Sequence, residues 1–542
     1  MPVWVSTAAS AATLGPERCD GQALRRRLLG LGRFDGLRAD MFAAMRGPSS
    51  ASIDHRLPRD AWAPVAGVAV AVTGFLIALA GRYGPYRDEL YFVAAGHHPA
   101  WGYPDQPSLT PLIAAFADTA APGNVVVLHL LGALTAGAIV VVSALTAREL
   151  GGTRAAQVLT AVVAATGVVT LVIGHFLSTT TLDVLFWTLI VLFALRALGR
   201  DEPRWWAAAG VTAGVCLENK QLVVFLLCGL AVGLLVTPHG RLHLRSQWLW
   251  CGVLVAFLLC LPNIVWQATN GWPELTISAD INAEYRAPGE RAFYVVQQLV
   301  LFSPLAGALW RVFGLVQLLR RDRFAWARPV AVAYLVIFTA FLGSGGKGYY
   351  VAGILPALAA AGCVVLAERW PVRRLAAGGL ALALCGAVAR PAAVPLLPPK
   401  TLADSVYSFI GEDQLETIGW PAFVSTIRGV VESLPPAERA SAVVYASNYG
   451  EAGSLAYYGL TTPVYSGHNG WAAWGPPPDV AAPVVVVGLE DPSASFTGCR
   501  AAATIDNGLE VDNEEQGKTV WLCDAPRGSW SAVWLDLEHL NG

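Results

Sequence analysis

Charged residues are scarce in this chain of 542 residues. Asp, Glu, Lys and Arg make up 14% of it, hydrophobic residues make up 55%, and the mean hydropathy is +0.49. A soluble domain contains about 25% charged residues, so this composition predicts an integral membrane protein surrounded by membrane lipids. The formal net charge of −2 leaves no long basic face to neutralise phosphates. We therefore expect no nucleic acid among its partners.

A secretory signal is also lacking. The first sixty residues contain nine arginines and no long apolar run, which is typical of a disordered cytoplasmic leader over residues 1–60. All three methionines, Met1, Met41 and Met45, lie in this stretch, and translation could begin at any of them. We assign no function to it.

Cysteines at metal-ligand spacing are missing as well. Five of the nine cysteines lie in apolar runs, which is typical of small buried side chains rather than of metal ligands. These five are Cys216, Cys228, Cys251, Cys260 and Cys363.

Long apolar runs, by contrast, recur along most of the chain. About twenty apolar residues cross the hydrocarbon core of a bilayer. By this measure there are eleven candidate spans, at 62–81, 124–147, 155–174, 176–195, 205–217, 221–236, 247–267, 292–310, 329–343, 349–367 and 375–390. The short runs 205–217 and 221–236 could instead form a re-entrant pair.

Arginine is distributed unevenly between the connections that join these runs. Connections rich in arginine alternate with connections that are poor in basic residues, and the arginine-rich set includes the N-terminal leader. Because Lys and Arg favour the cytoplasmic side, the protein is predicted to lie in the cytoplasmic membrane with its N-terminus on the cytoplasmic side. The segments predicted outside are 82–123, 175–179, 218–220, 269–291, 343–348 and everything after residue 391.

The chain changes character after the last apolar run. Residues 391–400 are rich in proline and predict a linker, and residues 401–542 have the composition of a soluble domain. The runs SAVVYAS and APVVVVG are typical of buried strands, with helices expected near Phe423–Ser433 and Glu451–Tyr458. The segment predicted outside contains Cys499 and Cys523, which could form a disulfide there or remain free thiols.

Polar residues useful for chemistry concentrate on the connections predicted outside. Asp88 and Glu89 could form part of a site, or could simply stabilise the N-terminus of a helix. Lys220 and Lys347 could extend from span ends towards water, or could bind a phosphate. The tyrosines near these residues, among them Tyr103, Tyr349 and Tyr350, could belong to an interfacial aromatic belt or stack against a sugar.

Three further polar residues lie inside apolar runs and also allow two interpretations. Asp183 could cap a neighbouring helix or take part in a site. His129 and His175 are more typical of satisfied core histidines than of ligands. A carboxylate pair, lysines and aromatic residues on one face would suit transfer of a head group from an anionic lipid-linked donor to a hydroxyl acceptor.

Several motifs resemble one known family, in the order that the family has them. They are RYGPYRDELYFVAAGHHPAWGYPDQPSLTPL (82–112), STTTLDVLFW (178–187), LENKQLVVF (217–225), LPNIVWQATNGWP (261–273), GKGYYVAGILPAL (346–358), YGEAGSLAYYG (449–459), YSGHNGW and VDNEEQGKTVWLC (511–523). Together they resemble the GT-C glycosyltransferases of the dolichyl-phosphate-mannose-protein mannosyltransferase family. The likeness is greatest to the bacterial branch of lipid A aminoarabinose transferases and Rhizobium-type lipopolysaccharide glycosyltransferases, and it covers residues 62–535.

The resemblance implies a fold and a reaction. The fold is a polytopic α-helical membrane protein of about eleven transmembrane helices, with a C-terminal extracytoplasmic α/β domain. The reaction is an inverting transfer of a hexosyl or pentosyl group from a polyprenyl-phosphate donor to a lipid, glycan or protein acceptor, with Asp88 as the catalytic base and Glu89 supporting it. A transporter or lipid flippase is the alternative, although no internal repeat indicates one.

The resemblance also suggests ligand-binding residues. Asp105 and Gln106 occupy the donor-phosphate position, but the aminoarabinose enzymes have a lysine where this chain has Gln106, so Lys220 and Lys347 become substitutes. Tyr103, Tyr349 and Tyr350 would line the donor. Some GT-C enzymes need a divalent cation such as Mg or Mn, for which Asp88, His97 and His98 could supply ligands. Glu451, His468 and Asn469 could contact the acceptor or form an interdomain hydrogen-bond network.

Overall fold

The computed structural model describes residues 57–541, except for residue 201 and residues 299–304. The predicted leader and part of the predicted span 292–310 therefore lie outside the described residues. Within them, seven helices are long and apolar enough to cross a membrane. These are α3 (Trp62–Leu79), α6 (Val125–Glu149), α9 (Thr179–Gly199), α13 (Gln247–Thr269), α17 (Arg328–Ser344) with the short η2 (Asp322–Ala327), α18 (Leu355–Arg369) with η3 (Gly348–Ile354), and α19 (Val372–Ala389) with η4 (Arg390–Ala392).

One predicted span is bent rather than straight. The run predicted at 155–174 forms α7 (Arg154–Ala165) and α8 (Val168–His175), which meet at an angle of 58°. The break falls at Thr166 and Gly167, where Gly167 precedes α8 in an extended conformation. If the bent pair is one span, the described residues contain eight helices of spanning length.

Two shorter apolar helices occupy the runs that could have formed a re-entrant pair. These are α10 (Trp205–Leu217) and α11 (Val223–Val236). A Cβ atom at Gly210 would lie 2.2 Å from the backbone oxygen of Gly252, so α10 lies in close backbone contact with α13. A Cβ atom at Gly233 would lie 2.3 Å from the backbone oxygen of Pro329, so α11 packs closely against α17. Such small-residue contacts are typical of membrane helices. They favour two separate helices of the membrane bundle over a re-entrant pair.

The two kinds of connection meet at different ends of the helices, as the arginine distribution predicts. At one end, Arg196 on α9 pairs with Glu149 on α6 at 3.0 Å, and Arg323 pairs with Glu368. At the other end, Asn219 donates to the backbone oxygen of Thr179 at 2.7 Å. The polar connections are therefore brought together in space.

The long connections contain helices of their own. The segment 82–123 forms α4 (Arg87–His97) and α5 (Leu109–Ala120), and the segment after α13 forms α14 (Pro273–Glu284) and α15 (Pro288–Val296). Proline stands at the first turn of α14 and of α15, where its missing N–H costs nothing. The remaining helices before the soluble domain are α12 (Pro238–His243) and α16 (Leu305–Arg320).

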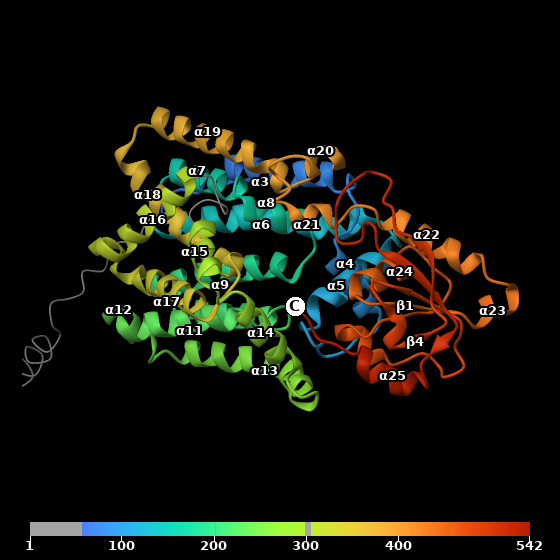
Figure 1. The fold of residues 1–542 in the computed structure, drawn as a ribbon. Helices are drawn as coiled ribbons and strands as arrows, with labels where there is room; N and C mark the ends of the chain where they lie inside the picture. The colour runs from blue at the N-terminus through green and yellow to red at the C-terminus, as the bar shows by residue number, and fades with distance from the viewer. Residues whose placement is uncertain (1–56, 201, 299–304, 542) are drawn as a thin grey trace, which may run out of the picture. The chain divides into compact units, whose positions relative to one another are not determined.

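The C-terminal segment folds as the predicted α/β domain (Figure 1). One sheet has the strand order β2-β1-β3-β6-β5, in which β1 pairs in parallel with β2 and β3 while β6 is antiparallel. The strands are β1 (Val443–Ala446), β2 (Val464–Tyr465), β3 (Val484–Val487), β4 (Phe496–Thr497), β5 (Arg500–Thr504), β6 (Thr519–Cys523) and β7 (Ala525–Pro526). The helices are α20 (Pro399–Ala403), α21 (Glu412–Leu415), α22 (Trp420–Glu432), α23 (Pro436–Ser441), α24 (Tyr449–Tyr457), α25 (Trp530–Leu537), η5 (Asn469–Trp474) and η6 (Pro492–Ala494).

Both predicted strands and both predicted helices of this domain are confirmed by β1, β3, α22 and α24. The disulfide between Cys499 and Cys523 is also present. Within the predicted linker, Ala393 and Val394 are buried in the same core cluster as residues of α3 and α6. This part of the linker is therefore packed against the membrane helices.

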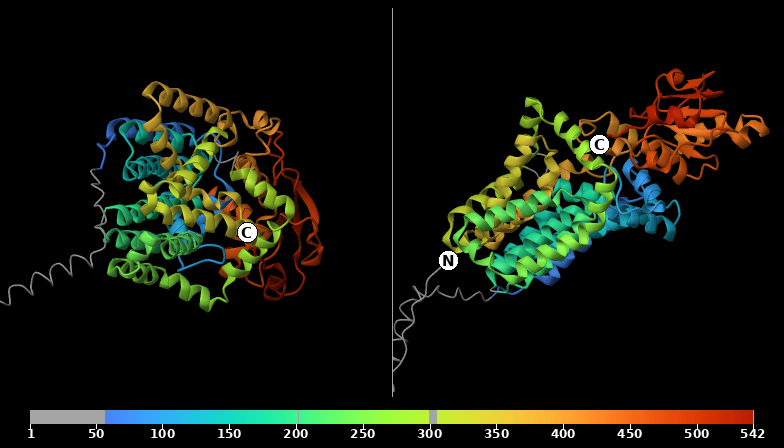
Figure 2. Two further views of the ribbon diagram at one scale, coloured as in Figure 1. Left: turned by 90° about the vertical axis from the view of Figure 1, so that its left-hand side faces the viewer. Right: turned by 90° about the horizontal axis from the view of Figure 1, so that it is seen from below.

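Helix α4 shares a hydrophobic core with the soluble domain. Its residues Leu90, Tyr91 and Phe92 belong to one buried cluster with Val444 of β1 and Val485 of β3. Figures 1 and 2 show α4 and α5 in blue beside the orange and red strands and helices of the C-terminal segment. The first turn of α4 therefore lies where the membrane helices meet the soluble domain.

Candidate active site

The adjacent carboxylates at the start of α4 have different surroundings. Glu89 is fully buried and accepts hydrogen bonds from the backbone N–H of Tyr86 at 2.8 Å and of Leu177 at 2.7 Å. It also lies 3.1 Å from Nε2 of His129. Asp88 is partly exposed and, among the described residues, accepts one hydrogen bond, from the hydroxyl of Tyr449 at 2.9 Å. Asp88 is therefore the carboxylate of the pair that remains able to accept another proton donor.

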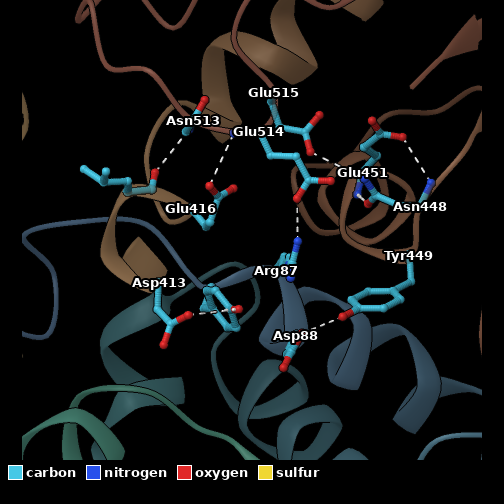
Figure 3. Close-up of polar contacts among 12 residues, drawn as sticks. Arg87, Asp88, Asp413, Glu416, Asn448, Tyr449, Glu451, Asn513, Glu514 and Glu515 are labelled. Atoms are coloured by element: carbon cyan, nitrogen blue, oxygen red, sulfur yellow. Dashed lines mark hydrogen bonds and ion pairs between the residues drawn. The ribbon is translucent and has the colours of Figure 1, made fainter. Parts of the chain in front are cut away.

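Residues of the soluble domain surround the first turn of α4 (Figure 3). Arg87 pairs with Glu514 at 2.5 Å, and the hydroxyl of Tyr86 donates to Asp413 at 3.5 Å. Burial raises the pKa of Asp413, and the nearby charge of Asp88 raises it further. The soluble domain thus contributes both a hydrogen-bond donor and a second carboxyl group beside Asp88.

Lysine side chains lie on the membrane-helix side of Asp88. Nζ of Lys220 donates to Oγ1 of Thr180 at 3.0 Å and lies 5.6 Å from the ring centres of Tyr349 and Tyr350. Burial lowers the pKa of Lys220 and the neighbouring charge of Lys347 adds to this effect, whereas Asp183, Asp88 and Glu274 favour its charged form.

These interactions place both predicted lysines within electrostatic reach of the site. Lys347 lies 5.7 Å from the ring centre of Tyr285. The structure therefore brings Asp88, Lys220, Lys347, Tyr349 and Tyr350 into one neighbourhood, although they come from three separate segments.

Asp105 links the first long connection to the soluble domain. It accepts hydrogen bonds from the hydroxyl of Tyr91 at 2.9 Å and from Nδ2 of Asn469 at 3.3 Å. The same tyrosine oxygen accepts from the backbone N–H of Gly470 at 3.1 Å. Burial raises the pKa of Asp105 to about 7. Asp105 and Asn469 thus belong to an interdomain hydrogen-bond network, the alternative that the sequence left open for Asn469.

Tyr103 and Gln106, the other two candidates of this connection, differ in their hydrogen bonding. Tyr103 is buried, and its hydroxyl contacts the backbone oxygens of Ala95 at 2.7 Å and His98 at 3.1 Å, so it holds the connection in shape. Gln106 is also buried, and its Nε2 has no hydrogen-bond partner among the described residues. The proposed contact of either side chain with a donor phosphate stays a prediction.

The structure does not bring the three suggested metal ligands, Asp88, His97 and His98, together. His97 pairs with Asp118 at 3.0 Å, and His98 contacts the backbone oxygen of Ala94 and stacks on Trp474. Asp88 is at the opposite end of α4, about 13 Å away along the helix axis at 1.5 Å per residue. Within the described parts of the chain, no group of three His, Cys, Asp or Glu side chains could hold a metal ion.

The histidines in the membrane helices have structural surroundings. Nδ1 of His129 lies 2.8 Å from the backbone oxygen of Ala80, and its Nε2 faces Glu89. His175 is buried with its ring centre 4.9 Å from that of His129, but neither of its ring nitrogens has a hydrogen-bond partner among the described residues, so it is not the satisfied core histidine that the sequence predicts. Asp183 is buried and accepts a hydrogen bond from Cys216 at 3.4 Å. His129 therefore acts as the core histidine that its sequence context indicates.

Glu451 and His468 have partners inside the soluble domain. Glu451 is fully buried and accepts from the backbone N–H of Ser447 at 3.0 Å and from Nζ of Lys518 at 3.1 Å. Nδ1 of His468 accepts from the backbone N–H of Tyr449 at 3.3 Å, and burial lowers the pKa of His468 to about 3. Both contacts stabilise the segment that presents Tyr449 to Asp88.

Three residues of this neighbourhood are missing from the sequence-based candidates. Tyr449 opens the motif YGEAGSLAYYG, so the motif was a usable signal. Asp413 lies in an ordinary polar stretch, and Glu274 follows a span without any distinctive spacing. Burial raises the pKa of Glu274 to about 8, and only its position in the fold reveals that the charge of Lys220 acts on it.

Comparisons with known proteins agree with this architecture. Residues 105–266 match the family model described as dolichyl-phosphate-mannose-protein mannosyltransferase. Among solved structures, the chain is similar to ArnT from Cupriavidus metallidurans in the apo state, with a TM-score of 0.58 at 17% identity, and bound to undecaprenyl phosphate, with a TM-score of 0.55 at 16% identity. Each match covers 84% of this chain and 97% of the ArnT chain.

The sequence search against curated proteins finds no match. The family match and the shared fold confirm the resemblance that the sequence motifs indicate. The chain has the fold of a GT-C membrane protein and carries, over residues 105–266, the sequence signature of the dolichyl-phosphate-mannose-protein mannosyltransferase family.

Proposed function

We propose that this protein is a membrane glycosyltransferase that moves a sugar from a polyprenyl-phosphate donor to an acceptor hydroxyl, with Asp88 as the general base. The observation that carries the proposal is the difference in hydrogen-bond partners between Asp88 and Glu89. Glu89 has three hydrogen-bonding partners, whereas Asp88 has one among the described residues, Tyr449, and lies near Lys220. The ArnT structure bound to undecaprenyl phosphate supports a polyprenyl-linked donor.

The reaction follows from the placement of these groups. The acceptor oxygen attacks the anomeric carbon of the donor sugar and forms a new C–O bond while its proton passes to Asp88. The bond from that carbon to the phosphate oxygen breaks, and the electron pair leaves with the polyprenyl phosphate. Lys220 and Lys347 are placed to neutralise the departing phosphate. Attack from the face opposite the leaving group inverts the configuration at the anomeric carbon.

The location of the reaction is part of the same proposal. The arginine-rich connections meet at one end of the helices and the polar connections at the other. By the positive-inside rule, the arginine-rich end faces the cytoplasm. We therefore place the N-terminus inside, and Asp88 and the soluble domain on the outer face. Alkaline phosphatase fused after residue 542 should be active, whereas activity only in a fusion after residue 60 would reverse this topology.

The function is tested with the purified full-length protein and a panel of synthetic polyprenyl-phosphate hexoses and pentoses. Mass spectrometry should detect free polyprenyl phosphate and a glycosylated product, and the envelope of a strain lacking the protein should lack the same modification. Movement of the donor lipid across a vesicle membrane without a covalent product would instead support the flippase alternative. Repeating the assay with EDTA, Mg²⁺ or Mn²⁺ tests whether the reaction needs a divalent cation.

A further inference from the structure

A cleft of about 720 Å³ lies in the soluble domain next to α4. Its lining includes Ser447, which directly follows β1, and Gly488, which directly follows β3. From β1 the chain passes through α24 to β2 on one side, whereas β3 lies on the other side of β1. The cleft is therefore at a topological switch point of parallel strands, the position where open α/β sheets bind ligands.

Two residues connect the cleft to the candidate base. The side chain of Tyr449 lines the cleft, and its hydroxyl donates to Asp88 at 2.9 Å. Arg87, the residue before Asp88, lines the cleft as well. Figure 3 shows Arg87 and Tyr449 beside Asp88, with Glu514 on the side of the soluble domain. A ligand in the cleft would therefore lie close to the group that takes the acceptor proton.

The charges in the cleft are already balanced. Arg87 pairs with Glu514 at 2.5 Å. Lys518 pairs with Glu451 at 3.1 Å and with Glu515 at 3.0 Å. The cleft therefore offers little uncompensated positive charge to a phosphate or a carboxylate, and Glu490 in its lining adds a negative charge. An anionic ligand is disfavoured.

The remaining lining suits a neutral ligand rich in hydroxyl groups. Asn448 and Thr519 supply amide and hydroxyl groups, and Leu489 is the single aliphatic side chain in the lining, so the cleft is too polar for an acyl chain. The rings of His468 and His539 stack with centres 4.5 Å apart, and the ring of Tyr449 lies 4.7 Å from that of His468. A sugar ring combines an apolar C–H face, which packs on such rings, with a hydroxyl edge that needs hydrogen-bond partners.

We propose that this cleft binds the acceptor and that the acceptor is a neutral carbohydrate chain, an inference that rests on the proposed function. The chain occupies the cleft, and its terminal hydroxyl passes Tyr449 to reach Asp88. The hydroxyl gives its proton to Asp88 and bonds to the donor's anomeric carbon, and polyprenyl phosphate leaves as described above. Donor and acceptor thus approach Asp88 from opposite sides, the donor from the lysines and the acceptor from the soluble domain.

The test fills the cleft without touching the base or the lysines. Thr519 lines the cleft, and its cross-strand partner Thr504 is exposed on the neighbouring edge strand outside the lining. Thr519→Trp and Leu489→Trp are compared with the matched control Thr504→Trp in the purified full-length protein. Two rates are measured: hydrolysis of the donor by water, and sugar transfer to fluorescent mannotriose, glucotriose and arabinotriose.

The wild type and Thr504→Trp should transfer sugar to at least one trisaccharide. Thr519→Trp and Leu489→Trp should transfer at least tenfold more slowly while hydrolysing the donor at the wild-type rate, which also shows that they fold. Unchanged transfer by both cleft variants, or donor hydrolysis by the wild type without transfer to any of the three trisaccharides, would overturn the inference. Absence of donor hydrolysis and of transfer in the wild type would instead reject the proposed function, and the inference with it.

Discussion

Among single residues, Asp88 and Glu89 start α4 side by side and use different partners. Glu89 is satisfied by groups 3, 40 and 88 residues away along the chain, whereas Asp88 meets a tyrosine 361 residues away. The motif and the family resemblance predict the acidic pair and its division into base and supporting residue, but they do not predict the partners that produce this division. The division depends on His129, Leu177 and Tyr449, which reach α4 only in the folded protein.

The hydrogen bond from Tyr449 positions Asp88 for proton transfer. Tyr449→Phe removes this bond, and because a hydrogen bond to a charged group contributes about 1.5–3 kcal/mol, we expect kcat to fall about 10- to 100-fold with little change in the donor KM. Tyr457→Phe on the same helix is the matched control, since its hydroxyl has no hydrogen-bond partner among the described residues. Equal kcat values for the two variants would show that Tyr449 does not position the base.

Lys220 has a different predicted task, which is to bind the donor phosphate. Lys220→Met keeps the length of the side chain but removes its charge, so the donor KM should rise about tenfold or more, as expected for the loss of about 1.4 kcal/mol of binding. Lys400→Met is the control, because Lys400 pairs with Glu510 in the soluble segment. Steady-state kinetics over a range of donor concentrations provides the comparison. An unchanged donor KM in Lys220→Met would remove Lys220 from the phosphate site.

Among the structural elements, α4 is fixed to the membrane helices by Glu89. Replacing Glu89 with Ala would leave His129 and two backbone N–H groups without their buried acceptor, and breaking a buried pair of this kind costs about 3–5 kcal/mol. Glu89→Ala should therefore lower the thermal midpoint in detergent strongly. Asp88→Asn should leave that midpoint close to the wild-type value. Similar midpoints for Glu89→Ala and the wild type would contradict this structural role.

The contact between the first long connection and the soluble domain should depend on pH through Asp105. Its pKa is about 7 in the folded protein and about 4 in an unfolded chain. Between these values the folded state binds more protons, so stability falls as the pH rises from about 4 to about 7. Thermal midpoints at pH 5, 6, 7 and 8 should decline more steeply for the wild type than for Asp105→Asn. The difference between the two curves removes the parallel contributions of Glu274 and Asp413, and identical slopes would refute the assignment.

The sequence predicts those helices whose hydropathy sets them apart from the rest of the chain. Membrane helices such as α6 and α13 are evident from hydropathy, because bilayer thickness sets their length. The connection helices α4 and α14 carry no such signal and were predicted only as external connections. The bend between α7 and α8 was also missed, because an apolar run reads the same whether it is straight or bent at Gly167.

For the molecule as a whole, the arginine distribution predicts which connections share an end, and the structure brings the polar ones together. The packing of α4 against the soluble domain was not predictable, since the apolar runs that contain Val444 and Val485 predict buried strands without indicating which element packs against them. The candidate site therefore depends on both parts of the chain. Asp88 comes from the first connection, its lysine neighbours come from later connections between the membrane helices, and Tyr449 comes from the soluble domain.

The most direct test of this account measures sugar transfer by Asp88→Asn in the purified full-length protein. The variant removes the proton acceptor but keeps the size of the side chain, so transfer should fall at least about 100-fold while donor binding and the thermal midpoint stay at wild-type values. Asp118→Asn is the matched control, because Asp118 pairs with His97 at the far end of α4. Its transfer rate should equal that of the wild type. Full transfer activity in Asp88→Asn would contradict the assignment of Asp88 as the base.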